Sequence, residues 1–127
     1  MADSKKIILA VDDMAVGLTT VRTILQQEYD VRLAKSAAIA LDMLSHFKPE
    51  LILLDIEMPE MTGFEFTRLL RQNPEYSDIP VIFVTSHANP QFIDQAVEFG
   101  AEGYIVKPYI PEALIKRVKA VLETEDS

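Results

Sequence analysis

The residue in this sequence that is best placed to take part in chemistry is Asp55, a carboxylate that directly follows the apolar run 51–54. Branched side chains bounded by Pro49 and Pro59 are typical of a short strand buried on both faces. In parallel α/β sheets, ligands bind at the carboxyl ends of the strands, so an acid at that place is a candidate for chemistry. Taken alone, Asp55 is also compatible with a helix cap or a loop acid.

Three further apolar runs end in polar residues of complementary kinds. The runs and their ends are 6–11 with Asp12 and Asp13, 81–84 with Thr85 and Ser86, and 103–106 with Lys107 and Pro108. If these strands are parallel, three carboxylates, a hydroxyl and an ammonium group meet at one edge of the sheet. The sequence therefore predicts a single polar site built from residues far apart in the chain.

Composition limits the kind of protein that holds this site. The 127 residues predict one domain with a core over about 6–122, and with 123–127 as a solvated tail or the start of a linker. Cysteine is absent, which excludes disulfides and thiolate metal ligands. No apolar run reaches the roughly 18 residues of a membrane span, and the start does not resemble a secretion signal. We expect a cytoplasmic protein, and the net charge of −8 argues against direct nucleic-acid binding.

Helical patterns alternate with the strands, and several have recognisable ends. The expected end signals are Ser36 before the second helix, the Thr62 and Glu65 capping box before the third, Asn89 and Pro90 before and Gly100 after the fourth, and Pro111 at the start of the fifth. The expected inner faces are Met14, Leu18, Val21 and Leu25; Ala37, Ala40, Leu41 and Leu44; Phe66, Leu69 and Leu70; Phe92, Ile93, Ala96 and Val97; and Leu114, Ile115, Val118, Val121 and Leu122. Gly17 is a mild flaw in the first helix, at about 1 kcal/mol relative to alanine.

With the alternating run 31–34 as an edge strand, the pattern is (βα) repeated five times. This alternation predicts a three-layer α/β domain, with a parallel sheet covered by helices on both faces and right-handed crossovers.

The expected site suits a divalent cation and a phosphoryl group. Carboxylates about 4 Å apart repel each other by roughly 4 kcal/mol per pair at an effective dielectric constant near 20, so three of them favour a cation between them. Oxygen-only ligation suits Mg²⁺. Asp55 can attack a phosphoryl group as a nucleophile, while Lys107 pairs with one phosphoryl oxygen and the Thr85 hydroxyl donates to another.

These residues, in this order on consecutive strand ends, resemble the receiver domains of two-component response regulators. The resemblance runs from about Lys6 to Leu122 and includes the Leu-Leu-Asp-Ile-Glu-Met-Pro segment around Asp55 and the Thr62-Gly63 pair that follows it. It implies a flavodoxin-like fold with strand order 2-1-3-4-5.

The resemblance also implies a role for each site residue. Asp55 would be the phosphoacceptor, Asp12 and Asp13 would hold Mg²⁺ directly or through water, and Glu57 would contribute its backbone carbonyl. The peptide bond between Lys107 and Pro108 would be cis, as it is in the family.

Signalling in this family moves the threonine and lets an aromatic side chain on the fifth strand rotate inward. Thr85 and Tyr104 stand at those positions, and the affected face would be the helix 89–99, the fifth strand and the last helix. A half-buried edge-strand tyrosine without a switching role is the alternative for Tyr104. Glu57 and His87 stand at the two positions that vary within receivers and tune hydrolysis of the acyl phosphate. For Glu57 the sign of the effect is open, and a histidine such as His87 is more often an ordinary surface loop residue than a catalytic group.

The implied function is that of a bacterial phosphorelay switch that catalyses its own phosphorylation and slow dephosphorylation. The donor would be a sensor histidine kinase or a phosphotransfer protein, and the switched face would bind an output domain or target protein, with a homodimer on activation left open. No output domain is expected within this chain. The alternative from another class is a haloacid-dehalogenase-type phosphatase, which generally has a second aspartate where Glu57 stands and a cap insertion that is missing here. A flavodoxin-like cofactor binder fits less well, because Asp12 and Asp13 would repel a flavin phosphate.

Overall fold

The computed structural model describes residues 5–86 and 90–123 and shows a five-stranded parallel sheet within them. The strands lie in the order β2-β1-β3-β4-β5, so the predicted flavodoxin-like topology is confirmed. Their bounds are β1 Ile7–Val11, β2 Asp30–Ala34, β3 Leu51–Asp55, β4 Val81–Thr85 and β5 Gly103–Val106. The helices are α1 Ala15–Leu25, α2 Ala37–Leu44, α3 Gly63–Gln72, α4 Pro90–Glu98 and α5 Pro111–Leu122.

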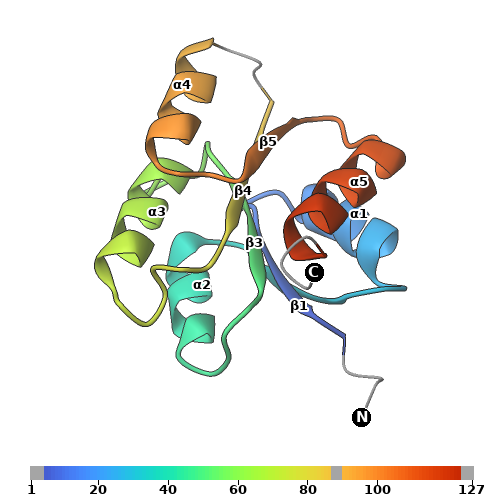
Figure 1. Cartoon of the computed structure of the whole chain (residues 1–127), viewed down its shortest axis with the longest axis horizontal. Helices are drawn as coiled ribbons and strands as arrows, with labels where there is room; N and C mark the ends of the chain where they lie inside the picture. Colours follow the sequence, from blue (N-terminus) through green and yellow to red (C-terminus); the bar gives the residue numbers. More distant parts are fainter. Residues whose placement is uncertain (1–4, 87–89, 124–127) are drawn as a thin grey trace.

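The helices form a layer on each face of the sheet. Figure 1 shows α1 and α5 together on one face and α2, α3 and α4 on the other. Two apolar cores follow from this arrangement, one with Phe66 and Phe83 beneath α2 to α4 and one with Leu114 and Val118 beneath α5. Burial on both faces explains why β3 and β4, which are buried along their whole length, read as continuous apolar runs.

The register of the sheet decides which strand ends are neighbours. Leu54 of β3 is aligned with Val11 of β1, so the residues that follow these two strands emerge side by side. On the other side of β3, Asp55 is aligned with Val84 of β4. Thr85 in turn is aligned with Val106 of β5, one residue before Lys107. All four strands thus end at the same edge of the sheet.

Several predicted helix ends are confirmed. The Ser36 hydroxyl accepts a hydrogen bond from the Ile39 N–H, and Thr62 and Glu65 form the capping box of α3. Pro111 is in the first turn of α5, and Gly100 has a φ of 72° just after α4. Asn89, the predicted cap of α4, lies outside the described residues.

Three residues predicted for the inner helix faces are exposed instead. Met14 precedes α1 and is 58% exposed, Leu69 is 41% exposed, and Val97 is 72% exposed. Each lies at the margin of its expected stripe. Helix α4 is the clearest case, because it stands at the end of its layer in Figure 1 and buries only Ala96 fully among its described residues. An outermost helix has a narrower inner face than one flanked on both sides.

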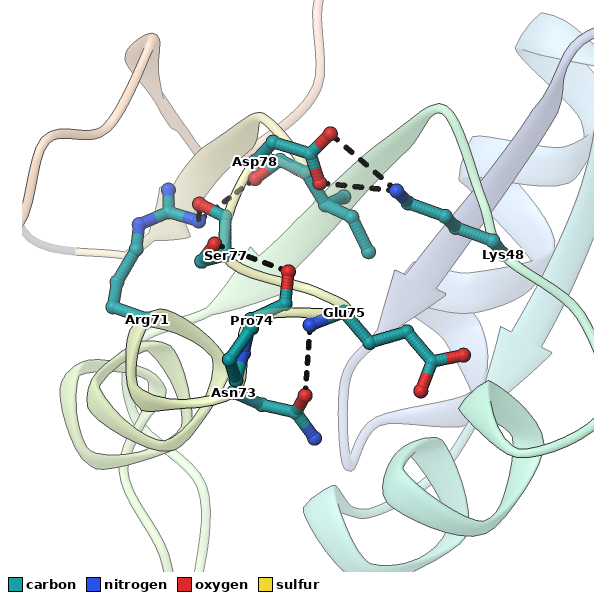
Figure 2. Close-up of polar contacts among 8 residues, drawn as sticks. Lys48, Arg71, Asn73, Pro74, Glu75, Ser77 and Asp78 are labelled. Atoms are coloured by element: carbon teal, nitrogen blue, oxygen red, sulfur yellow. Dashed lines mark hydrogen bonds and ion pairs between the residues drawn. The ribbon is translucent and has the colours of Figure 1, made fainter.

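The connection between α3 and β4 is held by polar contacts at the edge opposite the strand ends that carry Asp55 and Thr85. Figure 2 shows the Arg71 guanidinium donating to the Ser77 carbonyl at 3.1 Å, and it also donates to the Ile79 carbonyl at 2.9 Å. The Lys48 and Asp78 side chains form an ion pair at 3.1 Å nearby. These contacts fix the entry into β4.

No described helix has both the length and the apolar composition needed to cross a bilayer.

Candidate functional site

The structure brings the three predicted acids together at the carboxyl edge of the sheet. Asp12 follows β1 and Asp55 ends β3, and carboxylate oxygens of Asp12, Asp13 and Asp55 all lie within 4.8 Å of one another. Asp12 is 3% exposed and Asp55 is 5% exposed, whereas Asp13 is exposed. The site is therefore an acidic pocket formed by two buried carboxylates and one exposed carboxylate.

Lys107 extends into this pocket from the end of β5. Its Nζ lies 2.8 Å from Asp12 Oδ2 and 3.6 Å from Asp55 Oδ2, so it is paired with both buried acids. The Lys107 N–H donates to the Thr85 carbonyl at 2.8 Å, which joins the ends of β4 and β5. The peptide bond between Lys107 and Pro108 is cis, as the resemblance implied.

The remaining oxygens of the buried acids are bound to their own loops. Asp12 Oδ1 accepts a hydrogen bond from the Met14 N–H at 2.9 Å, and Asp55 Oδ1 accepts one from the Glu57 N–H at 3.1 Å. Each carboxylate thus has one oxygen fixed by the chain that follows it and one oxygen directed toward Lys107.

The crowding of acids changes the proton affinity of Asp55. Burial and the neighbouring Asp12 charge raise the pKa of Asp55 to about 7, against the lowering effect of Lys107 and the Glu57 N–H. Burial works to lower the pKa of Lys107, but the hydrogen bond that its ammonium donates to Asp12 and the charges of Asp55 and Asp12 raise that pKa overall. Without a metal, burial and the charge of Asp12 together therefore favour the protonated form of the Asp55 carboxyl.

The acidic pocket fits Mg²⁺. Its donors are all carboxylate oxygens, two of them on buried side chains, and Asp13 on the open side leaves room for water. Asp12, Asp13 and Asp55 would hold the ion, and its charge would offset both their mutual repulsion and the charge of a phosphoryl group. The contribution of the Glu57 backbone carbonyl stays a prediction.

Two of the remaining predicted residues, Thr85 and Tyr104, lie on β4 and β5, the strands that lead to this edge of the sheet. Thr85 is 2% exposed at the end of β4, next to Asp55 in the sheet register. Tyr104 lies on β5, aligned with Phe83, and is 37% exposed. Its switching role stays a prediction, and His87 lies outside the described residues.

Sequence reasoning assigned no role to Tyr109, whose pKa is raised by burial and by the charges of Asp12 and Asp55. The sequence signal that could have pointed to Tyr109 was its position directly after Lys107 and Pro108.

A second residue without an assigned role is Gly63, the first residue of α3. A Cβ at this position would stand 2.5 Å from the backbone carbonyl oxygen of Asp55, and the Gly63 N–H donates to the Ile56 carbonyl at 2.8 Å. The helix thus begins against the main chain of Asp55 itself, which only a residue without a side chain allows.

We expect Gly63→Ala to lower the free energy of unfolding by about 1 kcal/mol, because backbone atoms cannot move aside for the added methyl group. Chemical denaturation measures this loss. Gly103→Ala is the matched control, since a Cβ there would meet only the flexible Arg117 side chain, at 3.1 Å. Equal losses in both variants would contradict the close approach at Asp55.

Comparison with known proteins assigns the class. The sequence matches the response regulator receiver domain family over residues 8–119, and the chain belongs to this family. The fold agrees, since chemotaxis protein CheY4 of Vibrio cholerae superposes with a TM-score of 0.88 at 33% identity, covering 94% of this chain and 100% of that one. A structure described as the BeF3-activated DrrB receiver domain has a TM-score of 0.83 at 28% identity, with 94% and 98% covered.

Curated relatives are longer than this chain. The "Probable cyclic di-GMP phosphodiesterase" of Vibrio cholerae is 38% identical over 120 residues, which are 94% of this chain and 27% of that protein. Sensory transduction protein BceR of Halalkalibacterium halodurans is 29% identical over 117 residues, or 92% of this chain and 49% of that protein. The chain thus spans about a quarter to a half of the length of these relatives.

Proposed function

We propose that this receiver domain accepts a phosphoryl group on Asp55 from the phosphohistidine of a kinase or phosphotransfer protein. The observation that carries the proposal is the position of Asp55, whose buried carboxylate lies among Asp12, Asp13 and the Lys107 ammonium. A nucleophile, a set of metal ligands and a cation for the phosphoryl oxygens are therefore within one pocket.

The transfer follows from the groups present. An Asp55 carboxylate oxygen forms a bond to phosphorus while the bond from phosphorus to the donor imidazole nitrogen breaks, and the imidazole leaves with that electron pair. Lys107, 3.6 Å from Asp55 Oδ2, pairs with a phosphoryl oxygen, and the Thr85 hydroxyl donates to another. Water later attacks the phosphorus of the acyl phosphate, inorganic phosphate leaves and the Asp55 carboxylate is restored, so the domain catalyses its own slow dephosphorylation. This cycle makes it a switch rather than an enzyme with turnover on a substrate.

The switched surface is proposed to be the face formed by α4, β5 and α5. Thr85 at the end of β4 would move toward the phosphoryl group, and Tyr104, 37% exposed on the adjacent strand, would rotate inward behind it. That face would bind an output domain or target protein, or a second copy of the chain. A cytoplasmic location belongs to the same proposal.

Glu57 and His87 are proposed to tune the lifetime of the acyl phosphate. Glu57 is exposed two residues after Asp55, where it can hold a water molecule or repel an anionic donor. We therefore expect Glu57→Ala to change the half-life of the phosphorylated protein, measured by the loss of acid-labile phosphate with time. His87→Ala is measured in the same way. Unchanged half-lives in both variants would contradict this role.

Beryllofluoride tests the proposal as a whole, because it mimics a phosphoryl group on a carboxylate. The description of the DrrB receiver domain as BeF3-activated supports this choice of probe. We expect a stoichiometric complex in the presence of Mg²⁺ that changes the NMR signals of α4, β5 and α5, and that Asp55→Asn does not form.

Sustained hydrolysis of phosphomonoesters would instead favour the phosphatase alternative. Failure of the parent protein to bind beryllofluoride with Mg²⁺ present would overturn the proposal.

A further inference from the structure

Gly17 stands in the first turn of α1, where its presence needs an explanation. Glycine is among the poorest residues for a helix interior, because it loses the most backbone freedom on folding. Its backbone does not have the positive φ that favours glycine, whereas that of Gly100 does. The reason for glycine here therefore lies in the space around it and not in its conformation.

The place that a side chain on Gly17 would take is occupied by residues of the acidic pocket. A Cβ on Gly17 would stand 2.5 Å from Asp12 Oδ2 and 3.4 Å from Asp12 Cγ, and 3.7 Å from Lys107 Nζ. A contact of 2.5 Å is far below ordinary van der Waals separation, so one of the two groups has to move.

The Asp12 carboxylate has little freedom to move away. Its Oδ1 accepts from the Met14 N–H at 2.9 Å, its Oδ2 accepts from Lys107 at 2.8 Å, and the residue is 3% exposed. Lys107, in contrast, borders a cavity of about 510 Å³ that Gly17 also lines. Because both carboxylate oxygens are bound, displacing the carboxylate would disturb its hydrogen bond with the Met14 N–H, its contact with Lys107, or both.

We infer that Gly17 is a positioning residue, whose missing side chain sets the place of the Asp12 carboxylate against Lys107 and Asp55. The inference deepens the proposed function, because it concerns the same metal-binding and phosphoryl-accepting pocket. It makes the flaw in α1 a requirement of the site, because even a methyl group at position 17 would stand 2.5 Å from the Asp12 oxygen that accepts from Lys107.

A double-mutant cycle in metal-free protein tests this steric coupling without phosphorylation. In the parent, Gly17→Ala introduces a residue that favours the helix but also displaces Asp12. We therefore expect the melting temperature of this variant to equal that of the parent or to be lower. In an Asp12→Ala background the obstacle is gone, and the same substitution should raise the melting temperature by about 3 °C. Thr19→Ala, on the exposed side of α1, is the matched control and should have equal effects in both backgrounds.

A rise of similar size for Gly17→Ala in both backgrounds would overturn the inference, whatever the fate of the phosphorylation proposal. Magnesium binding gives a second measurement that needs no Asp12 variant. We expect Gly17→Ala to weaken the affinity for Mg²⁺ about tenfold, as loss of an orienting contact does at other metal sites, while Thr19→Ala leaves it unchanged. An unchanged Mg²⁺ affinity in Gly17→Ala would overturn the link to the metal site.

Discussion

Asp55→Asn is expected to abolish covalent phosphorylation, whereas the parent protein takes up one phosphoryl group per chain from a small acyl phosphate or a phosphorylated kinase. The amide keeps the size of the carboxylate but is a poor nucleophile, and it also removes one of the three acids that could hold a metal ion. Intact-mass spectrometry measures the outcome directly. We expect the mass increase of one phosphoryl group in the parent and no increase above background in the variant.

Asp42→Asn is the matched control for this experiment. Asp42 is an exposed acid of α2, and its one ion pair among the described residues is with His46 at 3.9 Å, so its amide should leave phosphorylation intact. Treatment with hydroxylamine identifies the kind of phosphate bond, because it cleaves an acyl phosphate and leaves a phosphate ester in place. Hydroxylamine-labile phosphate retained by Asp55→Asn would show that a carboxylate other than Asp55 is an acceptor.

The part of the site that could be predicted from sequence is the part fixed by strand ends. Once four apolar runs were interpreted as parallel strands, the acids after residue 11, Asp55, Thr85 and Lys107 had to share one edge of the sheet, and the register confirms that they do. This inference works because parallel strands place their carboxyl ends together whatever the packing of side chains around them.

The contacts within the site could not be predicted in the same way. Lys107 pairs with Asp12 more closely than with Asp55, at 2.8 Å against 3.6 Å, and this order depends on how the segment after β5 turns. Gly17 and Gly63 approach the two buried acids from helices α1 and α3, and such approaches are set by helix packing. In the sequence, Gly17 was only a flaw in its helix, and Gly63 was only part of the motif that follows Asp55.

Helix faces were predicted less well at their margins than at their centres. Leu18 and Val21 are buried as expected, but Met14 is exposed because the helix begins one residue later and the chain enters from the solvent side. The apolar pattern gives the direction of a face, whereas its width depends on how many neighbours cover the helix.

The metal-free protein is expected to lose stability as the pH rises from about 4 to about 7, because of Asp55. Its pKa is raised to about 7 in the folded state, while an unfolded chain has the ordinary value of 3.8. Between these values the folded protein holds a proton that the unfolded chain has released, so the stabilisation is fully present below pH 4 and is lost as the pH passes 7. The loss is on the order of 4 kcal/mol. Denaturant unfolding in the presence of a chelator, repeated at each pH, measures it.

Asp55→Asn isolates this effect, since the amide does not titrate while all other acids are unchanged. We expect the variant and the parent to have similar stability near pH 4, and the variant to be more stable by about the same 4 kcal/mol at pH 8. Adding Mg²⁺ to the parent should restore stability at pH 8 and have little effect near pH 4, because the ion competes with protons for the carboxylates. Parallel stability curves for parent and variant across this pH range would contradict the raised pKa, and with it the picture of Asp55 as a buried acid held among like charges.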